Sequence, residues 1–126
     1  VGGGGLISTL SDYEKFAKML LNNGKTPKKQ ILGEETFKLL HTGFAPKRTN
    51  ANEKWGLSVR VVVGDGHETL PVGAYGWSGA YGPHFWIDPA NKVAAIFLKN
   101  SHTDGGSRSE SGRNFEIAVN ASFERA

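Results

Sequence analysis

The chain has 126 residues, 38% hydrophobic and 21% charged, and it contains no cysteine. This composition excludes a disordered polar chain, a disulfide framework and a thiolate metal site, but it leaves the cellular compartment unknown. The net charge is +3, and the basic residues are scattered. Nucleic-acid binding is not expected, because no basic stripe carries interleaved aromatic residues. A membrane span is not expected either, because no apolar run approaches the roughly 18 residues that it needs.

The first predicted element is an amphipathic helix after the glycine-rich start of the chain. Ser11 and Glu14 fit a capping box, in which each side chain closes an open backbone N–H of the first turn. The apolar residues that follow have helical spacing and form one stripe: Tyr13, Phe16, Ala17, Leu20 and Leu21. Gly24 stands where a left-handed capping residue is expected at the end of the helix.

A second, shorter helix is predicted within residues 31–43. Glu34 and Glu35 favour its N-terminal end, where the helix dipole is positive, and Gly43 ends it. The following segment, residues 44–53, is polar and is predicted to be a loop.

From Trp55 the hydrophobic period changes from helical to alternating. Residues 55–63 are predicted to form a strand with one wet face, on which Arg60 and Val62 would lie. Further strands are predicted over residues 69–80, 82–89 and 92–101, with turns at Asp65-Gly66 and Asp88-Pro89. A mobile loop over residues 101–113 and a helix over residues 114–126 complete the chain.

The order of these elements predicts the fold class. Helices followed by a run of antiparallel strands indicate an α+β fold, with an antiparallel sheet flanked by helices, rather than a parallel α/β sheet. The length suggests one domain at most.

Three local motifs invite a function, and each fails on its spacing. A phosphate loop ending at Gly24 would need a glycine five residues earlier, where Met19 stands. A nucleophile elbow at Ser78 would need a second glycine where Ala80 stands, and a helix rather than a strand after it. No metal site is expected, because the histidines lack ligand spacing: His41, His67, His84 and His102.

Four segments, in order, resemble the C-terminal part of the serine β-lactamase-related family. This family includes class C β-lactamases, DD-peptidases and related serine esterases. The segments are residues 2–24, 31–40, 55–61 and 76–101. The resemblance implies the C-terminal portion of a β-lactamase/transpeptidase-like fold.

The resemblance also implies a site at residues 77–81. Trp77-Ser78-Gly79 matches the family's third motif, commonly Lys-Thr-Gly, and the backbone N–H of Ala80 would form half of an oxyanion hole. Gly79 would let a substrate approach without a Cβ clash. Ser78 would form a hydrogen bond with a polar group of the substrate. Trp77 and Tyr81 would contact the substrate. Because a tryptophan replaces the lysine, the esterase-like members are favoured.

The first motif of the family, Ser-x-x-Lys, does not occur in the sequence. The resemblance therefore implies a single partial domain, 1–126, that is a C-terminal fragment of a serine hydrolase and is inactive alone. The parent enzyme would act on a small ester, amide or β-lactam-like substrate without a cofactor. Residues 92–99 would leave an exposed edge, so a companion N-terminal segment or self-association is expected there.

Two alternatives stay open at this point. The aromatic residues between 73 and 86 suit a non-catalytic binding module that stacks on sugars, and a catalytically dead scaffold of the same family would have the same sequence features. The position of the rings distinguishes the binding module from the hydrolase. A binding module would present the rings on one open face, whereas the hydrolase interpretation buries Trp86 and places Trp77 at the rim of a cleft.

Overall fold

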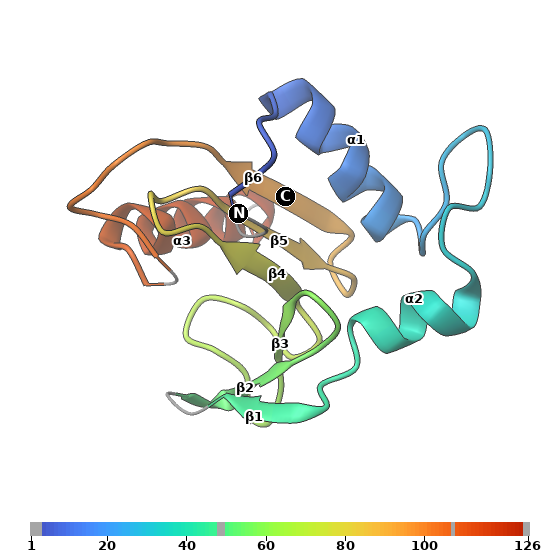
Figure 1. Cartoon of the computed structure of the whole chain (residues 1–126). Coiled ribbons are helices and arrows are strands. Elements are labelled where there is room, and N and C mark those ends of the chain that lie inside the picture. Colours follow the sequence, from blue (N-terminus) through green and yellow to red (C-terminus); the bar gives the residue numbers. More distant parts are fainter. Residues whose placement is uncertain (1–3, 48–49, 107, 125–126) are drawn as a thin grey trace.

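The computed structural model of the chain describes residues 4–47, 50–106 and 108–124. Within these residues the strands form one antiparallel sheet in the order β1-β2-β3-β4-β5-β6 (Figure 1). The elements are α1 (Leu10–Leu21), α2 (Glu34–Leu40), β1 (Ala45–Lys47), β2 (Asn50–Trp55), β3 (Arg60–Val62), β4 (Tyr75–Ser78), β5 (His84–Asp88), β6 (Val93–Phe97) and α3 (Glu110–Glu124). This arrangement confirms the predicted α+β class.

The sheet lies between two helical layers, because its strands carry apolar residues on both faces. One face packs against α1 and α2 through a core that includes Leu20, Phe37 and Phe85. The other face packs against α3 through a core that includes Trp86 and Phe115. The ring of Phe85 lies 5.2 Å from that of Tyr13 on α1, and Figure 1 shows α3 beyond the sheet. Consecutive residues of β5 therefore serve opposite layers, as strand alternation requires.

The first helix begins earlier than the capping box predicts. Thr9 is its N-cap, and the Thr9 hydroxyl accepts a hydrogen bond of 3.2 Å from the backbone N–H of Asp12. Ser11 lies inside the first turn, so its predicted capping role is wrong. Gly24 has a φ of +81°, and its N–H donates to the carbonyl of Met19 at 2.9 Å, which confirms the predicted left-handed residue after the helix.

The predicted boundaries around Trp55 are wrong. The segment expected to be a loop contains β1 and most of β2, and the segment expected to be one strand contains a turn between β2 and β3. Ser58 has a φ of +72°, and the N–H of Gly56 donates to the carbonyl of Val59 at 2.8 Å. Hydrophobic alternation does not reveal this turn, because the apolar residues continue at every second position from Trp55 through Leu57 and Val59 to Val61.

The face of β3 expected to be wet is buried. Arg60 and Val62 have only 5% and 1% of their surface exposed. Val62 packs with Leu70 and Ala74 from the segment that connects β3 to β4, and α3 covers the same layer. Burial on this face depends on residues distant in sequence, which the local pattern does not contain.

The later elements are close to their predicted positions. The strand expected over residues 69–80 is reduced to β4, since Pro71 and Gly73 lie in the preceding connection. β5 and β6 fall inside their predicted ranges, and α3 begins at Glu110, inside the segment expected to be a loop. These elements bring the β4–β5 hairpin and α3 together around the site described next.

Candidate active-site strand and its adjoining cavity

The predicted motif lies at the end of β4, where one edge of the strand is open. β4 pairs with β5 along its whole length, up to the pair Ser78↔His84. With β3 it pairs only through Tyr75 and Gly76. Within the described residues, the edge of β4 at Trp77 and Ser78 thus has no strand-pairing partner on the β3 side.

Ala80 lies in the turn that joins β4 to β5. The N–H of Gly79 donates to the carbonyl of Pro83 at 2.8 Å, and the carbonyl of Gly79 accepts from Gly82 and from Gly106, both at 3.0 Å. In the part of the chain that the structure describes, the N–H of Ala80 donates to no other group, and the residue is exposed. The amide that the sequence singles out is therefore not used inside the sheet.

The loop before α3 contacts this turn through Gly105 and Gly106. Gly106 supplies the N–H that reaches the carbonyl of Gly79. A Cβ added at Gly105 would overlap the carbonyl oxygen of Ala80. Only glycine allows this close approach, so the conformation of the Ala80 peptide depends on a loop more than twenty residues away in sequence.

The aromatic residues near the motif differ in exposure. Trp86 is buried, with 1% of its surface exposed, whereas 41% of Trp77 is exposed. The ring of Trp77 lies against that of Trp55, with centroids 4.9 Å apart. Tyr81 is exposed and meets the ring of His102 edge-on at 4.8 Å. Trp77 and Tyr81 are accordingly accessible at either end of the motif.

A cavity of about 250 Å³ lies beside the motif, against α3. Its lining includes Asn52, Arg60, Ser78, His84, Arg113 and Glu116. Of the five residues predicted to form the site, only Ser78 lines this cavity; Trp77, Gly79, Ala80 and Tyr81 do not. The motif thus faces two environments, the open edge of β4 and the cavity.

Ser78 is the first member of a hydrogen-bond chain that leads into the protein. Its Oγ lies 2.8 Å from Nδ1 of His84, and Nε2 of His84 lies 2.7 Å from a carboxylate oxygen of Glu116. The hydroxyl of Thr69 donates to the other carboxylate oxygen of Glu116. His84 and Glu116 are each only 5% exposed, so the inner part of the chain is shielded from water.

The ionisation of Glu116 follows from its partners. Burial by itself raises the pKa of this carboxyl group, but hydrogen bonds from His84 and Thr69 outweigh burial and hold the pKa below its ordinary value. Glu116 is therefore a carboxylate near neutral pH, and a carboxylate only accepts hydrogen bonds.

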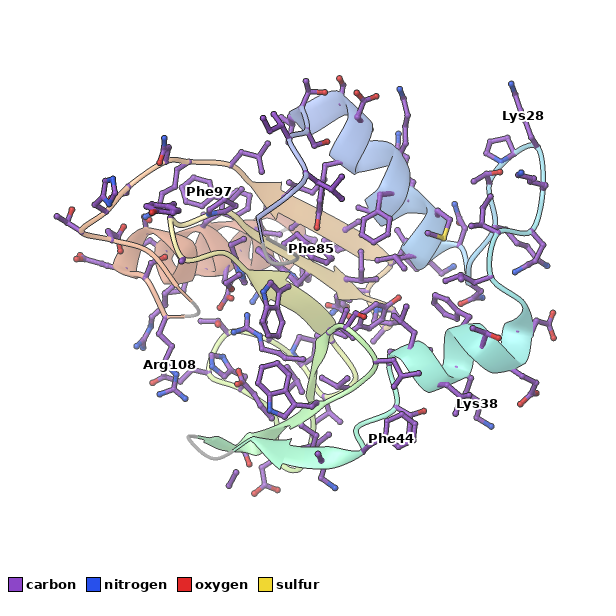
Figure 2. All side chains as sticks on the ribbon, in the orientation of Figure 1. Lys28, Lys38, Phe44, Phe85, Phe97 and Arg108 are labelled. Atoms are coloured by element: carbon purple, nitrogen blue, oxygen red, sulfur yellow. The ribbon has the colours of Figure 1, made fainter. Side chains whose placement is uncertain are left out.

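Cationic side chains surround the outer part of the cavity. Arg60 Nη2 donates to the Oγ of Ser78 at 3.4 Å, and Arg60 Nε lies 3.8 Å from the carboxylate of Glu53. Arg113 forms an ion pair with Glu68, and Arg108 extends from the loop before α3 (Figure 2). Two of these arginines, Arg60 and Arg113, are therefore paired with carboxylates.

Sequence reasoning missed His84, Glu116 and Arg60 as members of this region. His84 could have been found from a tight hairpin, because it faces Ser78 in the register of β4 and β5. Glu116 lies 32 positions further along the chain and carries no local signal. Its proximity to His84 depends on how α3 docks on the sheet.

Across residues 4–47, 50–106 and 108–124, no group of three or more His, Asp or Glu side chains is placed to hold a metal ion. In the same residues, no helix has the length and apolar character needed to cross a membrane.

Comparison with known proteins identifies the family of the chain. A sequence model described as Beta-lactamase matches residues 2–118. Two proteins of Mycobacterium tuberculosis are similar to the chain: the uncharacterized protein MT1414 of strain CDC 1551 / Oshkosh and the protein Rv1367c of strain ATCC 25618 / H37Rv. Each is 30% identical to it over 112 residues, and each match covers 76% of this chain. The chain spans only 28% of the length of these relatives. The matched span and the α+β fold together show that the chain belongs to the Beta-lactamase family, whose fold is that of related serine hydrolases.

Proposed function

We propose that residues 1–126 are the C-terminal part of a serine hydrolase, forming one partial domain. The intact enzyme would hydrolyse a small ester, amide or β-lactam-like substrate through an acyl-serine intermediate, without a cofactor. The sequence contains no Ser-x-x-Lys, so the nucleophile and its base would come from outside this chain. The chain alone would then be inactive.

The open amide of Ala80 carries this proposal. A tetrahedral acyl intermediate places negative charge on the former carbonyl oxygen, and one fixed N–H aimed at that oxygen contributes roughly 3 kcal/mol. The Ala80 N–H is unused by the sheet, and the turn that contains it is held by Gly79, Gly82 and Gly106. These features support a role as one half of an oxyanion hole.

The neighbouring residues would contact the substrate. Gly79 presents no side chain at the open edge of β4, and Ser78 offers a hydroxyl. Trp77 and Tyr81, both exposed, would form apolar walls on either side. A tryptophan in place of the motif lysine favours an uncharged acyl group and hence an ester.

Labelling with a fluorophosphonate probe tests the proposal. We expect the longest natural protein that contains these residues to be labelled on the serine of a Ser-x-x-Lys motif, and the isolated 126-residue chain to remain unlabelled. A labelled serine in the isolated chain would contradict its inactivity. A longer protein that is folded but unlabelled would favour the catalytically dead scaffold.

The exposed pair Trp55 and Trp77 supports a second candidate, the aromatic binding module. The two rings are 37% and 41% exposed and lie together on one surface. Burial of Trp86 counts against this candidate. Quenching of tryptophan fluorescence by soluble oligosaccharides, abolished by Trp77→Ala, would favour the binding module over the hydrolase.

We also propose a partner for the free edge of β6. β6 is the last strand of the sheet in the described residues. Its unpaired backbone groups are a template for another strand. A companion N-terminal segment of the same protein is the proposed occupant, and a second copy of the chain is the alternative.

A further inference from the structure

The hydrogen-bond chain from Ser78 to Glu116 has no role in the proposal above. We infer that Ser78, His84 and Glu116 form a proton relay that serves the cavity, in which Ser78 contacts the reacting water or alcohol and the other two residues position Ser78. This inference rests on the proposed function, because it assigns the relay to hydrolysis of the acyl-enzyme.

The direction of the protons follows from the partners. The carboxylate of Glu116 can only accept, so Nε2 of His84 must carry a proton toward it, at 2.7 Å. In neutral histidine the other ring nitrogen is then an acceptor. Nδ1 of His84 therefore accepts a hydrogen bond from the Ser78 hydroxyl, with 2.8 Å between Nδ1 and Oγ. Ser78 also lines the cavity, and Arg60 donates a hydrogen bond to the Ser78 oxygen.

The surroundings of the relay are consistent with this polarity. Thr69 donates to Glu116 from the segment before β4, and His67 lies 3.2 Å from Thr69. On the cavity side, the charged groups around Ser78 and His84 are Arg60 from β3, Arg108 from the loop before α3, Arg113 from α3, and the Glu53 and Glu68 carboxylates that pair with Arg60 and Arg113. Among the described residues, Glu116 is the carboxylate that contacts His84, and it determines which ring nitrogen of His84 carries the proton.

This arrangement can accept a proton during hydrolysis. A water or alcohol O–H would donate to the Ser78 oxygen and attack the acyl carbonyl, forming the new C–O bond. Its proton would pass to Ser78 while the proton of Ser78 passes to Nδ1 of His84, giving an imidazolium that faces the Glu116 carboxylate. The carbonyl electron pair would move to the oxygen near the Ala80 N–H, and the proton would return to the departing serine. Only water or alcohol is consumed.

Two observations favour a relay over a nucleophilic Ser78. The amide after Ser78, the N–H of Gly79, is already bonded to the carbonyl of Pro83 at 2.8 Å, so it is not available to an oxyanion formed on Ser78. Ala80 follows two residues later, so its Cα lies within about 7 Å of that of Ser78. The relay and the open amide could therefore act on one acyl group attached to a serine located elsewhere.

Nuclear magnetic resonance of the histidine rings in the 126-residue chain tests the geometry directly. We expect the ¹⁵N shifts of His84 to show the tautomer protonated at Nε2. Glu116→Gln should mix the two tautomers, because an amide can donate as well as accept. Glu110→Gln makes the same change of charge on the exposed side of α3 and should leave the tautomer unchanged. Protonation at Nδ1 in the unmutated chain would overturn the relay, whether or not Glu116→Gln folds.

Kinetics of the longest natural protein that contains these residues tests the role. We expect Ser78→Ala and His84→Asn to slow hydrolysis of the acyl-enzyme by about 10²-fold or more, the usual range for a lost acid–base group. Fluorophosphonate labelling should change little in His84→Asn, which keeps the Ser78 hydroxyl, and Glu110→Gln should behave as the unmutated protein. Unchanged hydrolysis in Ser78→Ala, with normal labelling, would refute the relay but leave the proposed function standing. Absence of any labelling would refute the proposed function, and the histidine tautomer would still decide the relay geometry.

Discussion

Gly76 and Gly79, on the same strand segment, have different reasons to lack a side chain. A Cβ at Gly76 would collide with the carbonyl oxygen of Phe85, whereas a Cβ at Gly79 would lie 3.3 Å from the ring of Pro83. We expect Gly76→Ala to lower the free energy of unfolding by about 1–3 kcal/mol, the usual cost of overpacking. Gly79→Ala should fold with a loss below about 1 kcal/mol and should block the proposed substrate approach. Urea unfolding of both variants distinguishes them, and equal losses would contradict the difference in close contacts.

The stability contributed by Glu116 should depend on pH. Glu116→Gln is expected to lower the free energy of unfolding by about 1.5–3 kcal/mol at neutral pH, because hydrogen bonds to a charged group are lost. The native pKa of Glu116 lies below its ordinary value of 4.5, so its contribution is present above the unfolded pKa and is lost as the pH falls through the native pKa. Urea unfolding at pH 7 and pH 3 measures the difference. A gap between the two proteins that is as large at pH 3 as at pH 7 would contradict this assignment.

The element that controls the candidate oxyanion hole is the loop before α3, not β4 itself. Gly105 contacts the Ala80 carbonyl too closely for any side chain. We expect Gly105→Ala to displace the turn at residues 79–82, and a misplacement of about 1 Å can cost roughly 10²-fold in rate. The rate of fluorophosphonate labelling in the longer protein measures this loss.

Gly106→Asn is the matched control for Gly105→Ala. Gly106 has a φ of +80° with open space around its Cβ direction, and asparagine tolerates this conformation better than other residues. Its N–H would still reach the carbonyl of Gly79. If both variants label at the same reduced rate, loop distortion in general and not the Ala80 contact is the cause.

An element could be predicted from the sequence when the apolar pattern of its own residues shows which of its faces is buried. α1, β5 and β6 show clear apolar patterns and were found. β1 and β2 were missed because their segment is polar, and the turn at Ser58 was hidden within an alternating run. A left-handed serine carries no sequence signal as clear as that of a glycine.

At the scale of the molecule, β6 lies at the edge of the sheet that the described residues form. If a companion segment pairs with this edge, the outward-facing amides of β6 should exchange slowly in the longer protein and rapidly in the isolated chain at low concentration. Hydrogen exchange followed by mass spectrometry measures both. Exchange that slows as the concentration of the isolated chain rises would indicate self-association instead. Rapid exchange in a soluble monomeric form of the longer protein would contradict the proposed pairing.

The sequence by itself determined the family and the fold class, because helical and strand periodicity and the order of four segments can be recognised without coordinates. It also led to the proposal for Ala80, since that proposal depends only on the place of the residue next to Trp77-Ser78-Gly79. The tertiary structure alone decided that Ser78 meets His84 and Glu116, and that Gly105 clamps the Ala80 turn. These contacts join a hairpin to a loop and a helix distant in the chain, so docking, rather than any local pattern, creates them.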